Sequence, residues 1–188
     1  MKNIVTLSLI PAAAILLSAC TAIIIDGYPN IPANYNDGDF DRAAAKGAIS
    51  TIVVGQPFSA QSGNAGDTVR GLMRNQVGIY PVSFVPQPGA DTTQPYKVVV
   101  VFNPRSNVDN RTICQTERQT PVTASSPEQV SVTMVFCDGN KLKSGISGRV
   151  GGVRDQSDPK FAALVRQVAN AMIPPLGLLR QLQTDNAN

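Results

Sequence analysis

The stretch YKVVVVFNP, residues 96–104, carries the strongest structural signal in the chain. Its unbroken apolar run, residues 98–102, consists of four valines and a phenylalanine, which are residues that favour strands. A strand with one face in solvent alternates apolar and polar residues, so this run predicts a strand covered on both faces. Pro104 has no amide hydrogen and is expected to end the strand. This segment is therefore the expected centre of a sheet.

Four more strands are expected around it. AISTIVVGQPF, residues 48–58, is an apolar run ended by a glycine and a proline, and residues 81–85 form a short apolar run. Residues 130–136 alternate apolar and polar positions, and Asp138-Gly139-Asn140 then turns the chain into KLKSGISGRV, residues 141–150. The last two segments predict a β-hairpin.

Two helices are expected. Asp67 is a candidate N-cap for a short helix with apolar residues at helical spacing up to residue 77. Asp158 precedes Pro159, which suits the first helical position, and a long apolar stripe follows as far as residue 173. The order β-α-β-β-β-β-α predicts an α+β fold: an antiparallel-rich sheet of about five strands with two helices packed on one face. This single domain is expected to span residues 48–175, with a C-terminal tail at 176–188.

The first residues are typical of an export signal. Lys2 is followed at residues 4–17 by a run of apolar or small residues that only Thr6 and Ser8 interrupt. About fourteen residues are too few to span the hydrocarbon core of a bilayer as a helix. The run is therefore interpreted as the apolar region of a signal peptide, and residues 1–19 are expected to be removed.

Leu17-Ser18-Ala19-Cys20 resembles the lipobox of bacterial lipoproteins. The resemblance implies that lipid is attached to the Cys20 sulfur, that the chain is cut before Cys20, and that the new amino group is acylated. Several acyl chains hold a protein firmly on a membrane. Thr21 follows the cysteine, which in this family favours the outer membrane, so we expect an outer-membrane anchor facing the periplasm. The alternative is an ordinary secretory signal with a chance cysteine.

Apart from Cys20, the chain contains two cysteines, Cys114 and Cys137. In an exported protein their expected state is a disulfide. The alternative, a redox-active pair, lacks the C-x-x-C spacing. Without residues 1–19 the chain has 15 basic and 13 acidic residues, which is too balanced to indicate nucleic acid as a partner.

Several segments together resemble a set of short proteobacterial lipoproteins of unknown role. They are TIVVGQPF, YKVVVVFNP, VFCDGN, GISGRVGG and DPKFAALVRQV, which cover most of residues 50–175. The resemblance implies an exported, disulfide-bonded and lipid-anchored protein. It implies no activity.

The chain contains no histidine. A Ser-His-Asp triad, a Cys-His pair, a histidine-rich zinc site and a histidine proton shuttle are therefore excluded within this chain. We expect no cofactor and no metal.

Residues 20–47 are interpreted as the lipidated cysteine and a tether that lifts the domain off the membrane. The segment is dense in Pro, Gly, Asn and Asp, which favour turns. Asp37, Asp39 and Asp41 resemble the start of a calcium loop, but the glycine is misplaced at Gly38 and Ala48 stands where the closing glutamate should be. A solvated turn is the favoured interpretation.

Four cations near the last strand form a candidate ligand-binding patch: Lys141, Lys143, Arg149 and Arg154. They could bind an anionic component of the envelope. The favoured alternative is an exposed edge strand whose charged side chains prevent pairing with another chain. The glycines of GISGRVGG do not match G-x-G-x-x-G and are expected to mark close backbone approach. A Ser-Lys hydrolase at Lys143-Ser144 is disfavoured because adjacent strand residues point to opposite faces.

Three classes of function remain open. The first and favoured class is a non-catalytic envelope protein that binds another envelope protein or has a structural role. The second is a binding module for an anionic envelope polymer or lipid. The third is a hydrolase that uses carboxylates, which requires two acidic residues in one concave pocket with separated pKa values.

Overall fold

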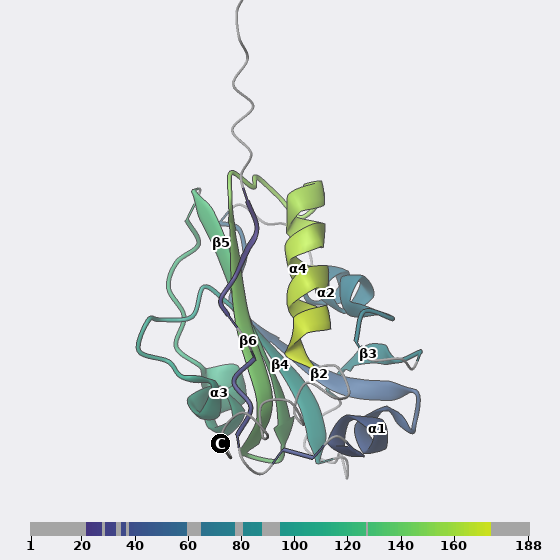
Figure 1. Cartoon of the computed structure of the whole chain (residues 1–188). Helices are drawn as coiled ribbons and strands as arrows, with labels where there is room; N and C mark the ends of the chain where they lie inside the picture. The colour runs from purple at the N-terminus through teal and green to yellow at the C-terminus, as the bar shows by residue number, and fades with distance from the viewer. Residues whose placement is uncertain are drawn as a thin grey trace, which may run out of the picture.

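The computed structural model describes residues 22–173 apart from 28, 33–34, 37, 60–64, 78–80, 88–94 and 127. Its strands form one sheet in the order β1-β6-β5-β4-β2-β3 (Figure 1). The strands are β1 (Ile24–Ile25), β2 (Ala48–Val54), β3 (Ser83–Pro86), β4 (Tyr96–Phe102), β5 (Gln129–Asp138) and β6 (Lys141–Gly151). The helices are α1 (Gly38–Ala44), α2 (Ala65–Met73), α3 (Asn110–Thr116) and α4 (Pro159–Met172), with a 3-10 turn, η1 (Glu117–Gln119), after α3. Among these residues, no helix has the length and apolar character needed to cross a membrane.

The sheet is mixed. β1, β6, β5 and β4 pair antiparallel, whereas β2 is parallel to both β3 and β4. The expected α+β class and the predominance of antiparallel pairing are confirmed, but the parallel part was not expected. It arises because α2 lies between β2 and β3 in the chain, and a helical crossover returns the chain in the same direction.

β4 has the buried position that its sequence predicts. Every residue from 98 to 102 is fully buried. Val98, Val100 and Phe102 belong to the core on one face of the sheet, and Val99 and Val101 belong to a second core on the other face. The prediction of a strand covered on both faces is confirmed.

The two expected helices, α2 and α4, share one face of the sheet, but α3, which was not expected, packs on the other face. The core that contains α2 and α4 covers one face, while α3 contributes Ile113 and Cys114 to the core of the other face (Figure 1). The missed helix α3 lies in the polar stretch 105–128. Its sequence signal is Asp109, whose carboxylate caps the helix by accepting a hydrogen bond from the Thr112 amide at 2.7 Å.

The segment interpreted as a tether packs on the domain wherever the structure describes it. β1 pairs with β6, Asn30 forms a bridge with Gly145, and Phe40 of α1 is 2% exposed. The Phe40 ring packs edge-on against Phe136 with 5.7 Å between ring centroids. Burial of such an aromatic side chain outweighs the turn-forming composition around it. The domain therefore begins before residue 48. Cys20, the signal at 1–19 and the tail at 176–188 lie outside the described residues.

The glycines of β6 allow two helices to approach the sheet from opposite faces. A Cβ atom on Gly145 would lie 2.6 Å from the side chain of Asn110 in α3. One on Gly148 would lie 2.6 Å from the side chain of Val168 in α4. Both distances are shorter than van der Waals contact. The expectation of close backbone approach is confirmed.

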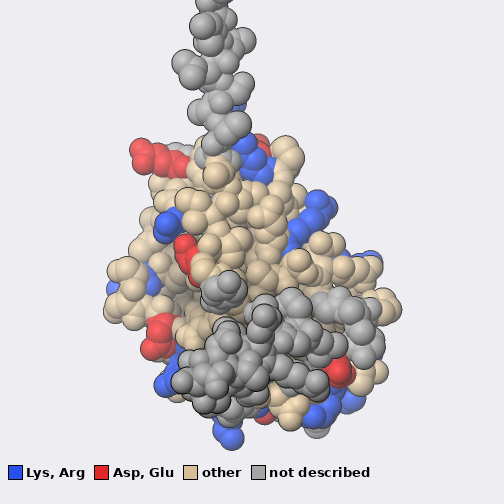
Figure 2. All heavy atoms as spheres, in the orientation of Figure 1, with Lys and Arg blue, Asp and Glu red and all other residues tan. Residues whose placement is uncertain are grey.

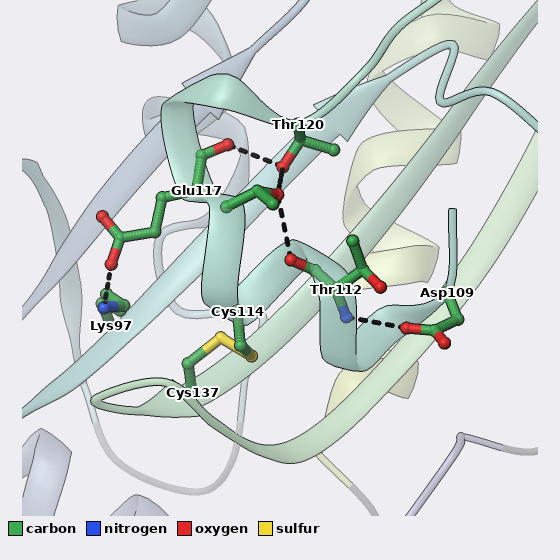
Figure 3. The surroundings of a disulfide bond; sticks show 8 residues. Lys97, Asp109, Thr112, Cys114, Glu117, Thr120 and Cys137 are labelled. Atoms are coloured by element: carbon green, nitrogen blue, oxygen red, sulfur yellow. Dashed lines mark hydrogen bonds and ion pairs between the residues drawn. A yellow bond between two sulfur atoms is a disulfide. The ribbon is translucent and has the colours of Figure 1, made fainter. Parts of the chain in front are cut away.

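A disulfide fastens α3 to the sheet. The sulfur atoms of Cys114 in α3 and Cys137 in β5 lie 2.00 Å apart, and both residues are fully buried (Figure 3). The bond closes a separation of 23 residues.

Replacing both cysteines by alanine is expected to lower the free energy of unfolding by about 3 kcal/mol, because the unfolded chain loses a cross-link. Urea unfolding of the two proteins measures the difference. A loss below about 1 kcal/mol would contradict the role assigned to the bond.

Candidate functional site

The four predicted cations do not form one patch. Lys141 and Arg149 lie near opposite ends of β6, roughly 26 Å apart at the usual rise of a strand. Arg154 follows β6 and is exposed, and Lys143 is buried. The interpretation as a protected sheet edge does not hold at Arg149, because β5 pairs along one side of β6 and β1 pairs with Gly148 and Arg149 on the other.

Lys143 instead belongs to a buried ionic cluster with α1. Its Nζ lies 3.0 Å from Oδ2 of Asp39 and 3.8 Å from Oδ2 of Asp138. Arg42 also pairs with Asp39, and the Tyr96 hydroxyl donates a hydrogen bond to Asp39 Oδ1 at 3.3 Å. The side chains of Asp39 and Lys143 are 3% and 9% exposed. The expected solvated turn at Asp39 is therefore wrong.

A β-bulge explains why Lys143 points to this cluster. Phe136 pairs with Ser144 and Cys137 pairs with Leu142, so Lys143 has no register partner. A bulge changes the direction of a side chain relative to a regular strand. Ser144 Oγ is buried without a hydrogen-bond partner, so Lys143 does not bind it and the two residues do not form a Ser-Lys pair.

The cluster keeps Asp39 ionised. Burial raises the pKa of this carboxyl, but the hydrogen bond from Lys143, the Asn36 amide and the charges of Lys143 and Arg42 together lower it below its usual value. A general acid would need a raised pKa. The cluster therefore connects α1 to β4, β5 and β6 and carries no sign of acid-base chemistry.

Two pockets formed by described residues are open to solvent. The first has a volume of about 280 Å³ and lies where β2 ends, next to the start of α2, with Arg70 and Arg118 in its wall. The second, about 310 Å³, is lined by Pro32, Arg111, Gln115, Asn140, Lys141 and Leu142. No acidic side chain is among the described residues that line either pocket. Among the described residues there is also no group of three metal-ligating side chains.

Lys141 is the one predicted cation that lines a described pocket, and its neighbour there is Arg111. Three further pocket residues, Arg70, Arg111 and Arg118, were not predicted from the sequence. No spacing in the chain connects Arg70 of α2 with Arg118 of η1, because the sheet topology brings them to one pocket.

Gly55 shapes the floor of the first pocket. Its φ angle of 79° is in the left-handed region that favours glycine, and a Cβ atom there would lie 2.5 Å from the Phe102 carbonyl oxygen. The chain can therefore turn sharply at the end of β2.

Comparison with solved structures finds similarity to PelC from Paraburkholderia phytofirmans. A PelC dodecamer in space group P6 is 14% identical, with a TM-score of 0.43, and the match covers 80% of this chain and 97% of that chain. A single-substitution variant of the dodecamer in space group C2 is 15% identical, with a TM-score of 0.42, and the match covers 82% and 99%. No protein-family model and no curated protein sequence matches this chain.

Replacing Lys143 by methionine is expected to lower the free energy of unfolding by about 3 kcal/mol or more, because the buried Asp39 loses its lysine partner. The matched control is Lys141→Met, two residues earlier on the same strand and exposed, with an expected change within about 0.5 kcal/mol. Urea midpoints measure both. Equal effects of the two substitutions would contradict the assignment.

Stability is expected to be flat between about pH 5.5 and 7.5 and to fall below about pH 4. There is no histidine to titrate in the neutral range. Because the pKa of Asp39 is lower in the folded than in the unfolded state, its stabilising effect is complete above about pH 4 and is lost as the pH falls further. Denaturant midpoints measured at several pH values from below about 4 to about 7.5 test the expected pH dependence of stability. A slope equivalent to one proton between pH 5.5 and 7.5 would contradict it.

Proposed function

We propose that this chain is a non-catalytic protein of the cell envelope, anchored by lipid on Cys20 to the outer membrane and facing the periplasm, with an interaction or structural role there. The observation that carries the proposal is the position of β1. It begins at Ile24, four residues after Cys20, and four extended residues reach at most about 14 Å. A lipid on Cys20 would therefore hold the domain directly against the bilayer, without a long spacer.

The end of the domain that would face the membrane follows from strand pairing. Ile24 pairs with Arg149, two residues before β6 ends at Gly151, and Gly151 pairs with Gln129 at the start of β5. Ile24 is 46% exposed, which is unusual for a large apolar side chain among the described residues. Acidic and basic side chains are both present at this end of the domain, at the top of Figure 2. With mixed charge at this end, attachment would depend on the acyl chains rather than on attraction to anionic lipids.

The third class, a carboxylate hydrolase, gains no support from the described acidic residues. Asp39 and Asp138 share Lys143, and neither lines a described pocket. A carboxylate hydrolase would need them exposed in a pocket with separated pKa values. The disulfide is of the kind that persists in exported proteins.

A binding module for an anionic polymer or lipid is the second candidate. It no longer rests on the group of Lys141, Lys143, Arg149 and Arg154, which the fold separates. It rests on the two pockets with basic walls.

Replacing Cys20 by serine is expected to abolish lipidation and leave the protein as unprocessed precursor or in the soluble fraction. Detergent-phase partitioning and cell fractionation measure this. The matched control is the double substitution Cys114→Ala and Cys137→Ala, which removes the other cysteines and should leave partitioning unchanged. Normal detergent partitioning of Cys20→Ser would refute the anchor.

The interaction role has its own test. Crosslinking in intact cells, followed by purification of the wild-type protein, is expected to recover an envelope protein that is lost with Cys20→Ser. Recovery of the same partner at the same yield from the soluble variant would show that anchoring has no part in the interaction.

A further inference from the structure

The pocket at the end of β2 lies where parallel strands commonly form a ligand site. The parallel strands are ordered β3-β2-β4, so the chain leaves β2 outward to β3 and then crosses back to β4. Ligands of parallel sheets commonly bind beyond the carboxyl ends of the strands. The end of β2 and the residues just beyond it line the pocket with Thr51, Ile52, Val53, Gly55 and Gln56.

β3 leaves this part of β2 uncovered. The last register pair between the two strands is Thr51 with Pro86, so β3 ends where β2 has three residues still to run. The pocket occupies the side of β2 beyond that point, with Pro86 and Gln87 at its border. The hollow is therefore a consequence of the short edge strand.

Two arginines reach this hollow from different elements. Arg70 belongs to α2, and its side chain is 11% exposed. One of its terminal nitrogens lies 2.5 Å from Oδ1 of Asp67, a carboxylate that is 67% exposed and does not line the pocket. A guanidinium has five N–H donors in a fixed fork, so one ion pair leaves most of them for other partners.

Arg118 lines the same pocket from the turn η1, whose backbone is fixed by several contacts. It lies in η1, directly after the helix that the Cys114–Cys137 disulfide fixes to the sheet (Figure 3). Its neighbour Glu117 forms an ion pair with Lys97, and Thr120 donates a hydrogen bond to the Glu117 carbonyl at 2.6 Å. Among the described residues, no salt bridge involves Arg118 itself. The backbone is therefore preorganised, which lowers the cost of ordering on binding.

The chemistry of the pocket favours an oxyanion. Among the described residues, the charged side chains that line it are Arg70 and Arg118 and none is acidic, and the amides of Gln56 and Gln87 add neutral hydrogen-bonding groups. Guanidinium groups bind carboxylate and phosphate by paired hydrogen bonds, and two of them can contact the free oxygens of a phosphate monoester or of a phosphodiester. A volume of about 280 Å³ is at the small end of ligand sites, so it suits one such group with a short attached fragment.

We propose that the pocket between Arg70 and Arg118 binds a phosphate group, carried either by a lipid headgroup or by a soluble phosphate ester. The site uses residues of the domain alone, so it does not depend on the lipid anchor at Cys20. Its failure would leave that anchor untouched.

The test is a titration of the full-length protein in detergent with glycerol 3-phosphate, followed by calorimetry. Saturable binding with a Kd of about millimolar order is expected for so small a ligand. Arg118→Gln is the main variant, because this exposed side chain has no structural ion pair to lose, and it should weaken binding about tenfold or more. Arg70→Gln should do the same. Arg74→Gln, an exposed arginine just after α2 that lines neither described pocket, is the matched control and should change the affinity less than twofold.

A second arm identifies the source of the phosphate. The protein is incubated with phosphatidylglycerol vesicles and with phosphatidylcholine vesicles, and accessibility at the pocket is followed by hydrogen exchange of residues 52–56. Protection by phosphatidylglycerol that Arg118→Gln removes supports a lipid headgroup, and binding of glycerol 3-phosphate without such protection supports a soluble ester. Absence of both responses, or equal loss of binding in Arg118→Gln and Arg74→Gln, overturns the proposal. Urea midpoints establish that each variant is folded.

Discussion

The absence of a polar face on β4 is the constraint on which the rest of the structure depends. Alternate residues of this strand are apolar toward both sides of the sheet, so both sides need a cover. α2 and α4 supply it on one side and α3 on the other (Figure 1). α3 has only seven residues and would be unstable alone, which is why its capping aspartate and its disulfide matter. Gly145 and Gly148 in β6 then let the helices of the two layers approach the same strand.

The buried pair of Lys143 and Asp39 has a different role from the apolar cores. Desolvation of two charges offsets much of their attraction, so such a pair adds little net stability compared with apolar residues of similar size. Separating the partners is costly, however, because each buried charge would lose its nearest counter-charge. The pair therefore penalises any other position of α1. Phe40, the residue after Asp39, enters the core at the same place, so charge and apolar burial specify one docking site for the N-terminal segment.

The parts of the fold that could be predicted are those with local signals. The five apolar residues of β4, the Asp138-Gly139-Asn140 turn and the Asp158-Pro159 helix start each act within a few residues, and all three agree with the structure. α1 and α3 could not be predicted because each contributes few apolar residues and is held by distant partners, Lys143 for α1 and Cys137 for α3. The candidate site was misplaced for the same reason. Lys141 and Lys143 were predicted to share a patch because they are close in sequence, but a one-residue bulge directs Lys143 into the protein interior. Arg70 and Arg118 are far apart in sequence, and the sheet topology brings them to one pocket.

Strand direction connects the proposed anchor with the proposed phosphate site. β2 is parallel to β4, and β4 and β6 are both antiparallel to β5, so β2 and β6 run the same way. The pocket follows the carboxyl end of β2, and β1 begins beside the carboxyl end of β6. Both features therefore belong to the same end of the sheet, separated by four strand spacings, or roughly 19 Å. A lipid on Cys20, at most about 14 Å from β1, would turn that end toward the bilayer. The anchor would then bring the two arginines near the layer of headgroup phosphates. A lipid headgroup is therefore the favoured source of the phosphate.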